Sequence, residues 1–131
     1  MNPTRGLHFA SYTYAGQRSG PRLIILGAVH GDEVCGTLAL RRIRAELDNG
    51  RLRIAAGSVT LVPVTNPLAF QLARRAGERD LNRRLCPVAH PRDFEDHVAN
   101  WLCPLLASHD VLLDLHSFRA PGTPFVLTGP H

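Results

Sequence analysis

The sequence predicts an α/β protein, a layered α/β/α sandwich built around a mixed, partly parallel sheet. Two observations carry this prediction: short apolar runs rich in β-forming residues, and segments between them whose apolar residues recur at helical spacing. An alternation of strands and helices is typical of parallel strands connected across one sheet. With 131 residues, 44% of them hydrophobic, the chain suits a single domain over residues 1–131.

The predicted elements follow one another along the whole chain. Leu7–Tyr14 and Leu23–Val29 are expected strands, and the turn-rich residues between them predict a hairpin-like pair. The later elements are a helix over Asp32–Leu47, a strand over Ser58–Val64, helices over Pro67–Ala76 and Asp93–Ala107, and strands over Val111–Leu115 and Thr123–Gly129. Because the last strand runs almost to the final residue, we expect a truncated N-terminal portion whose sheet is incomplete at the C-terminus.

The basic charge does not indicate nucleic-acid binding. The formal net charge is +4, but all 15 basic side chains are arginine, a bias that reflects genomic composition more than function. The aromatic residues are scattered rather than interleaved with the arginines, so we expect no nucleic-acid partner. No apolar run reaches the ~20 residues of a membrane span, and the N-terminus lacks a secretory pattern. We therefore expect a cytoplasmic protein without a membrane partner.

The cysteines predict free thiols rather than a disulfide framework. There are three, Cys35, Cys86 and Cys103, widely spaced and without a CxxC pair. We expect them to be small buried side chains.

Three side chains that can bind a metal lie beside the ends of two predicted strands. His30 follows Leu23–Val29, Glu33 opens the next helix, and His116 follows Val111–Leu115. Sites in open α/β sheets gather at the carboxyl ends of strands, so these side chains meet if the two strands are neighbours. Two imidazoles and one carboxylate are a ligand set typical of catalytic zinc, with a further position left open.

Asp114 adds to the metal interpretation. It stands two residues before His116, so both side chains leave the strand on the same face. A carboxylate in that place can orient a ligand histidine from behind. A lone H-x-x-E, or a lone histidine after a strand, is more often an ordinary surface or core residue, so the prediction depends on the two strand ends together.

A second polar cluster, "RRAGERDLNRRL" over residues 74–85, combines five arginines with Asn82 in a loop-forming stretch. Guanidinium groups bind carboxylates in a bidentate manner, and an asparagine supplies a further donor. The cluster is therefore a candidate anion clamp, and an arginine beside a polarised carbonyl can stabilise negative charge there. For Arg74, Arg79 and Arg84 we favour the plainer interpretation of a solvated basic face.

These motifs together resemble the succinylglutamate desuccinylase/aspartoacylase family, relatives of the zinc carboxypeptidases. The matching pieces are "GAVHGDE", "NP", "RAGERDLNR" and "DLHS", which occur in the family's order within residues 24–117. The resemblance implies a zinc carboxypeptidase-like fold, with His30, Glu33 and His116 as zinc ligands. It also implies that Arg75 polarises the scissile carbonyl, and that Asn82 and Arg83 hold the substrate's carboxylate. The implied reaction is amide hydrolysis of a small carboxylate-bearing N-acyl amino acid or a related compound.

One departure from the family concerns the general base. The family's base is a glutamate well after the third metal ligand, but no acidic residue follows His116 in this chain. We therefore expect the base beyond residue 131. The alternative is a non-catalytic relative, or an inactive fragment, that binds a metal or an anion. A serine hydrolase is disfavoured because no G-x-S-x-G follows a predicted strand.

Overall fold

The computed structural model describes residue 4, residues 6–118 and residues 120–129. Its regular elements are β1 (Tyr12–Ala15), β2 (Arg18–Leu26), α1 (Val34–Asp48), β3 (Ala56–Val62), α2 (Pro67–Gln71), one turn of 3-10 helix η1 (Leu81–Arg83), α3 (Phe94–Ala107) and β4 (Val111–Asp114). The strands form one sheet in the order β1-β3-β2-β4. β2 runs parallel to both of its neighbours and β1 runs antiparallel to β3, so the predicted mixed, partly parallel sheet is confirmed.

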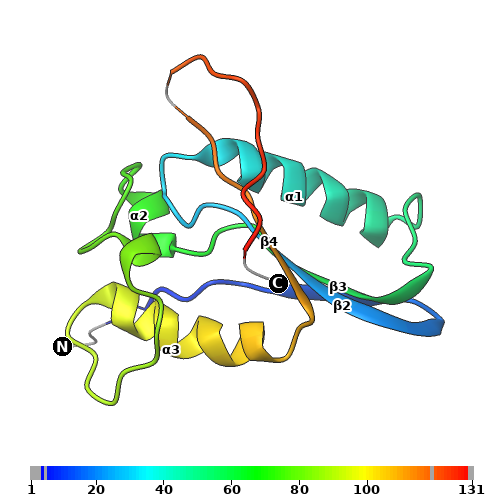
Figure 1. Cartoon of the computed structure of the whole chain (residues 1–131), viewed down its shortest axis with the longest axis horizontal. Coiled ribbons are helices and arrows are strands. Elements are labelled where there is room, and N and C mark those ends of the chain that lie inside the picture. The colour runs from blue at the N-terminus through cyan, green and yellow to red at the C-terminus, as the bar shows by residue number, and fades with distance from the viewer. Residues whose placement is uncertain (1–3, 5, 119, 130–131) are drawn as a thin grey trace.

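Helices cover both faces of this sheet, as the predicted α/β/α layering requires. α1 lies on one side of the strands and α3 on the other (Figure 1). Alternate residues of β2 enter two separate cores, because successive side chains of a strand point to opposite faces. Ile25 packs in a cluster with Leu40 of α1, whereas Ile24 and Leu26 pack in a larger cluster that includes residues of α3.

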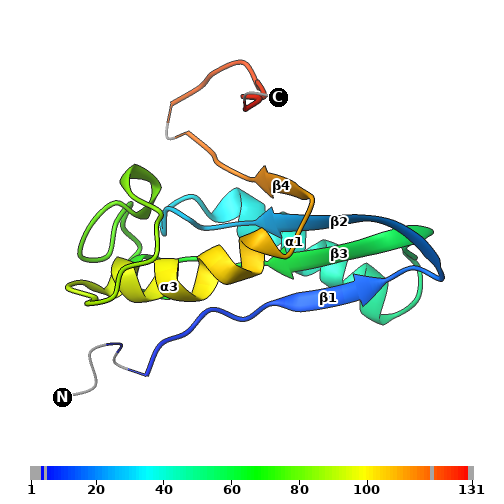
Figure 2. The same ribbon diagram turned by 60° about the horizontal axis from the view of Figure 1, so that its bottom comes forward.

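The predicted hairpin between the first two strands is wrong. Only two residues separate β1 from β2, yet β3 lies between them and pairs with both (Figure 2). The physical reason is burial: the apolar end of β2 needs neighbours along both of its edges, and the two parallel strands β3 and β4 supply them. β1, with alternately half-buried and exposed residues, suits the sheet's edge.

Two other predicted elements need correction. Thr123–Gly129 is not a strand. Its apolar side chains Phe125, Val126 and Leu127 are exposed, and the segment pairs with none of the described strands. The helix from Pro67 ends at Gln71, because Ala73 adopts a positive φ of 49° that an α-helix cannot continue.

The cysteines are free, as predicted, but they are not buried. Cys35 and Cys86 are exposed and Cys103 is half-buried. Among the described residues, no helix has the length and apolar character needed to cross a lipid bilayer.

Candidate metal centre

His30 is placed by a tight bend directly after β2. Ala28 has a φ of 47°, in the left-handed region that residues with a side chain seldom adopt. Two hydrogen bonds hold the bend against the loop after β3: the N–H of Thr65 donates to the Gly27 carbonyl at 2.9 Å, and the N–H of Asn66 donates to the Ala28 carbonyl at 3.0 Å. Sparsely populated backbone conformations of this kind cluster at functional sites.

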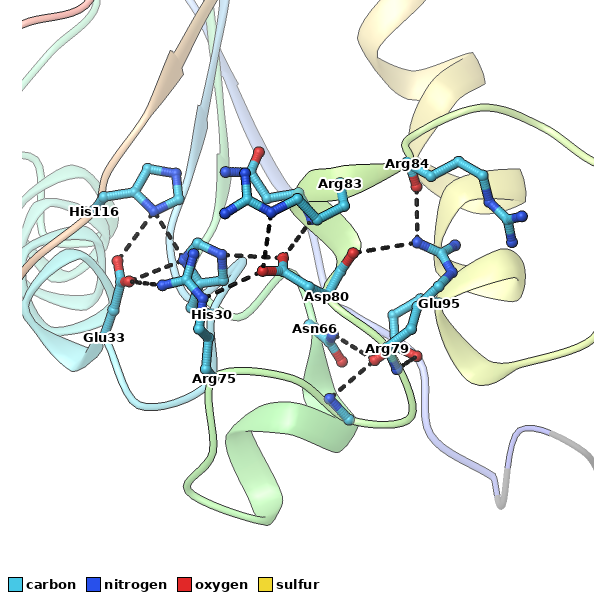
Figure 3. A network of polar contacts seen from close by, with 12 residues as sticks. His30, Glu33, Asn66, Arg75, Arg79, Asp80, Arg83, Arg84, Glu95 and His116 are labelled. Atoms are coloured by element: carbon cyan, nitrogen blue, oxygen red, sulfur yellow. Dashed lines mark hydrogen bonds and ion pairs between the residues drawn. The ribbon is translucent and has the colours of Figure 1, made fainter.

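Glu33 occupies the N-cap position of α1, where the turn after His30 ends. Its own N–H donates to the His30 carbonyl at 3.2 Å, but its side chain makes no capping hydrogen bond. The carboxylate points toward the histidines instead (Figure 3). The turn is also packed closely against α2, since a Cβ on Gly31 would overlap the backbone of Ala69.

His116 reaches the same place from the neighbouring strand. Leu26 at the end of β2 pairs with Asp114 at the end of β4, and the N–H of Leu115 donates to the Leu26 carbonyl at 3.0 Å. The strand ends are therefore level, and His116 stands opposite the bend that carries His30. The condition set by the sequence, that the two strands be neighbours, is met.

The three predicted ligands converge tightly. Each of them offers one ligand atom, and these atoms lie within 4.8 Å of one another. The Nδ1 atom of His30 is 2.9 Å from one Glu33 oxygen, and the Nδ1 atom of His116 is 3.0 Å from the other. The two Nδ1 atoms are themselves 3.1 Å apart. Side-chain exposure rises from 2% for His30 through 12% for Glu33 to 31% for His116, so the group is open on one side.

Each histidine is held from behind by an aspartate. His30 Nε2 lies 3.3 Å from an Asp80 oxygen, and His116 Nε2 lies 2.7 Å from an Asp114 oxygen. An imidazole that donates Nε2–H to a carboxylate keeps the lone pair on Nδ1 for a ligand, which is the usual arrangement around metal-binding histidines. Two such lone pairs facing each other beside a carboxylate suit a cation between them, so the donor set fits a metal ion.

The charges of this cluster shift the pKa values of its members. Burial works against ionisation of Asp80, but the Asn82 N–H and the neighbouring His30 and Arg75 side chains outweigh it and hold the pKa of Asp80 below its usual value. Burial likewise opposes protonation of His116, yet the adjoining Asp114 and Glu33 raise its pKa. For Asp114 burial prevails over the attraction of His116, and the pKa is raised.

The predicted arginine cluster lies against the same centre. Arg75 donates from Nη1 to Glu33 at 3.3 Å and from Nε to Asp80 at 3.2 Å, so its guanidinium bridges two acids of the site (Figure 3). The N–H of Asn82 donates to Asp80 at 3.0 Å, and Arg83 Nε stands 3.7 Å from the same aspartate. Arg83 is 75% exposed, which leaves its guanidinium accessible to an anion in solution.

The solvated basic face predicted for the remaining arginines is wrong for Arg79, which is only 20% exposed, whereas Arg84 is exposed as predicted but also forms an ion pair. Arg79 binds Asp93 at 3.0 Å and Asp96 at 2.9 Å, and Arg84 binds Asp96 at 2.6 Å. Arg74 alone of the three is exposed without such an ion pair among the described residues.

Sequence reasoning missed the acids of α3 that organise this loop. Asp93 caps the helix, accepting a hydrogen bond from the N–H of Asp96, while Glu95 and Asp96 are buried in its first turn. A signal was present in the pattern: Glu95 stands three and seven residues before the core residues Val98 and Leu102, next to the apolar face rather than opposite it.

The fold and the site together define an α/β protein with two histidines and a glutamate at the carboxyl ends of neighbouring parallel strands, a set able to hold a metal ion. The model of the succinylglutamate desuccinylase/aspartoacylase catalytic domain matches residues 19–121. The chain belongs to this family, and the family assignment made from its motifs is confirmed.

Known relatives agree with this assignment. The chain is 33% identical, over 102 residues, to the N-alpha-acetyl-L-2,4-diaminobutyric acid deacetylase of Halomonas elongata, covering 75% of this chain and 29% of that enzyme. An aspartoacylase family protein from Mesorhizobium loti superposes with a TM-score of 0.70 at 30% identity, over 86% of this chain and 35% of the other. A succinylglutamate desuccinylase/aspartoacylase from Rhodobacter sphaeroides gives 0.71 at 28% identity, over 82% and 32%. The chain therefore spans about a third of the length of these relatives.

Proposed function

We propose that this chain carries the metal and anion side of a zinc-dependent hydrolase active site, which cleaves an amide bond of a small carboxylate-bearing N-acyl amino acid. The observation that carries the proposal is the convergence of His30, Glu33 and His116, with an aspartate behind each histidine. Family membership supports deacylase chemistry on N-acyl amino acids. The cytoplasmic location expected from the sequence is part of the same proposal.

In this proposal His30, Glu33 and His116 hold the zinc ion. When bound there, zinc supplies Lewis-acid polarisation of a carbonyl and lowers the pKa of a water molecule. Asp80 and Asp114 keep the two imidazole rings oriented, with Nδ1 turned toward Glu33. Because Glu33 also accepts a hydrogen bond from the Ser117 N–H at 2.9 Å, its carboxylate is held in place from a second side.

The arginines and Asn82 act on the substrate. Arg75 lies beside Glu33, where its guanidinium can stabilise negative charge that develops on the scissile carbonyl oxygen. Asn82 and the exposed Arg83 bind the substrate's carboxylate, Arg83 through a bidentate pair. Glu33, Asp80 and Asp114 already bond to histidine or arginine side chains of the site. As the resemblance to the family implies, the general base of the full-length protein would be a glutamate after this segment.

Metal content and hydrolysis of the full-length protein test the proposal together. We expect about one zinc per chain after expression in zinc-supplemented medium, measured by elemental analysis, and hydrolysis of at least one member of a panel of N-acetyl and N-succinyl amino acids. The panel includes N-acetyl diaminobutyrate, because a relative is a deacetylase of that compound. Absence of bound zinc would contradict the proposal. Bound zinc without hydrolysis of any panel member would favour the non-catalytic alternative.

A further inference from the structure

Glu95 is a fully buried carboxylate in the first turn of α3, with 0% of its surface exposed. Its oxygens accept four hydrogen-bond donors: Asn66 Nδ2 at 2.9 Å, and the backbone N–H groups of Gly77 at 3.1 Å, Glu78 at 3.2 Å and Arg79 at 3.1 Å. Burial of a charged group is costly unless it is hydrogen-bonded, and here four donors compensate for the water that Glu95 has lost.

The three backbone donors belong to one short segment of the substrate loop, which is the stretch Arg75–Arg83 that carries the residues proposed to act on the substrate. Residues 77–79 connect Arg75, which bonds to Glu33, to Asp80, which bonds to His30. This stretch contains no regular structure between the end of α2 and the start of η1. Strand pairing or a helix therefore does not fix it, and the Glu95 carboxylate supplies successive hydrogen bonds in their place.

The fit between Glu95 and the loop is close on both sides. A Cβ on Gly77 would lie 2.5 Å from Glu95 Oε1 and 3.0 Å from a side-chain carbon of Leu68. Glycine thus allows the backbone to approach the carboxylate, and any larger residue would push the loop away from α3. Asn66 connects the same carboxylate to α2, since its side chain also accepts a hydrogen bond from the Ala69 N–H.

We propose that Glu95 is a positioning residue for substrate recognition. Glu95 holds residues 77–79. Because Arg75 precedes this segment and Asn82 and Arg83 follow it, Glu95 thereby fixes the positions of all three relative to the metal centre. Glu95 bonds to none of the three candidate ligands, and to no side chain that is proposed to touch the substrate. The inference rests on the proposed function, because it assigns Glu95 to the placement of that function's anion-binding residues.

Glu95→Gln in the zinc-loaded full-length protein tests this assignment. The variant keeps the shape of the side chain but directs an amide N–H group at backbone donors, so the loop must shift. Displacement of positioning groups by ~1 Å can cost ~100-fold in rate, and we expect kcat/KM to fall by about 10- to 100-fold, largely through a raised KM. Zinc content should stay near one per chain. Leu102→Ala is the control for lost stability: it truncates a buried residue of the same helix, nearly two turns from Glu95.

Gly77→Ala disrupts the same contact from the loop's side. It leaves every charge in place but forces the loop away from Glu95, so the same rise in KM is expected. Because both changes break one contact, the double variant should be no worse than the more severe single variant, whereas independent sites would give additive losses.

The outcomes separate this inference from the proposed function. An active wild-type protein whose KM is unchanged by Glu95→Gln, or raised equally by Leu102→Ala, would overturn the positioning role and leave the function intact. If the wild-type protein hydrolyses nothing, the proposed function fails. The affinity of the protein for succinate then tests whether Glu95 positions the anion-binding residues. A tenfold or greater loss of succinate affinity in Glu95→Gln supports the inference. An unchanged affinity, or no succinate binding by the wild-type protein, overturns it.

Discussion

The candidate metal centre and the substrate loop are neighbours, but they are positioned by different means. His30 and His116 follow the ends of β2 and β4, whose parallel pairing sets them level. The residues from Arg75 to Arg83 have only one turn of 3-10 helix, and buried acids of α3 hold them. Regular backbone pairing thus sets the two histidines level, whereas bonds from buried side chains to a loop place the groups proposed to bind the anion.

This difference predicts that the two regions fail separately when they are altered. Loss of a ligand should remove the metal while the loop keeps its place. Loss of a loop residue should weaken substrate binding while the metal remains. Three substitutions in the full-length protein test that separation, and a fourth tests the stability that a buried acid beside the loop contributes. The largest expected effect comes first.

His116→Ala should abolish most metal binding. The metal site loses one of its three protein ligands. Loss of only a ligand's hydrogen-bonding partner costs ~10–100-fold, so loss of the ligand itself should reduce hydrolysis by more than that. Elemental analysis and steady-state kinetics measure the two effects. His109→Ala is the matched control, since that histidine bonds to Thr60 at 2.7 Å, away from the centre, and should retain the metal. Undiminished zinc affinity in His116→Ala would exclude His116 as a ligand.

Arg83→Ala should weaken carboxylate binding far more than zinc binding. A charge-assisted hydrogen bond contributes ~1.5–3 kcal/mol, which corresponds to a rise of about 10- to 100-fold in the Kd of a carboxylate ligand. Calorimetric titration with succinate measures it. Arg84→Ala is the control from the next position, because that arginine is engaged with Asp96 instead. Equal losses of carboxylate and zinc affinity in Arg83→Ala would contradict the separation of the two regions.

Asp114→Asn should lower zinc affinity by about 10-fold, at the lower end of the usual range for such partners. The amide can still accept the His116 hydrogen bond at 2.7 Å, but it no longer carries the charge that makes the imidazole a stronger ligand. Competition with a chromophoric chelator measures the affinity. Succinate affinity of the zinc-saturated protein should be unchanged, and a parallel decline in both affinities would show that the regions are coupled.

Asp96→Asn should destabilise the fold in a pH-dependent way. The Arg92 N–H, followed by the side chains of Arg79 and Arg84, lowers the pKa of Asp96 to about 2, whereas an unfolded aspartate has a pKa of about 3.9. The carboxylate therefore adds stability that is complete above about pH 4 and is lost as the pH falls toward 2.

We expect the variant to lose about 2 kcal/mol at pH 6, and a smaller amount at pH 2.5, when urea unfolding is measured at both values. Asp110→Asn is the control: the pKa of Asp110 is also about 2, but its bonds are to the exposed Arg22, so its substitution should cost less. A difference between wild type and Asp96→Asn that grows on acidification would contradict this account.

The accuracy of the sequence predictions follows the same division. The ends of two apolar strands correctly located His30 and His116, because sheet sites gather at carboxyl ends whatever the loops do. The prediction of a hairpin was wrong because the choice of strand neighbour is made by long-range burial, and adjacency in sequence does not reveal it. Arg79 was misjudged for a similar reason, since its partners Asp93 and Asp96 lie on a helix that the loop reaches only in three dimensions.

The sequence by itself determined the alternation of strands and helices, the family and the set of side chains able to hold a metal, because these depend on local periodicity and on short motifs. The tertiary structure alone decided which strand lies between which, that Asp80 supports His30, and that Glu95 holds the loop. Such contacts join residues far apart in the chain. Burial and hydrogen-bond satisfaction, which act over the whole fold, select them.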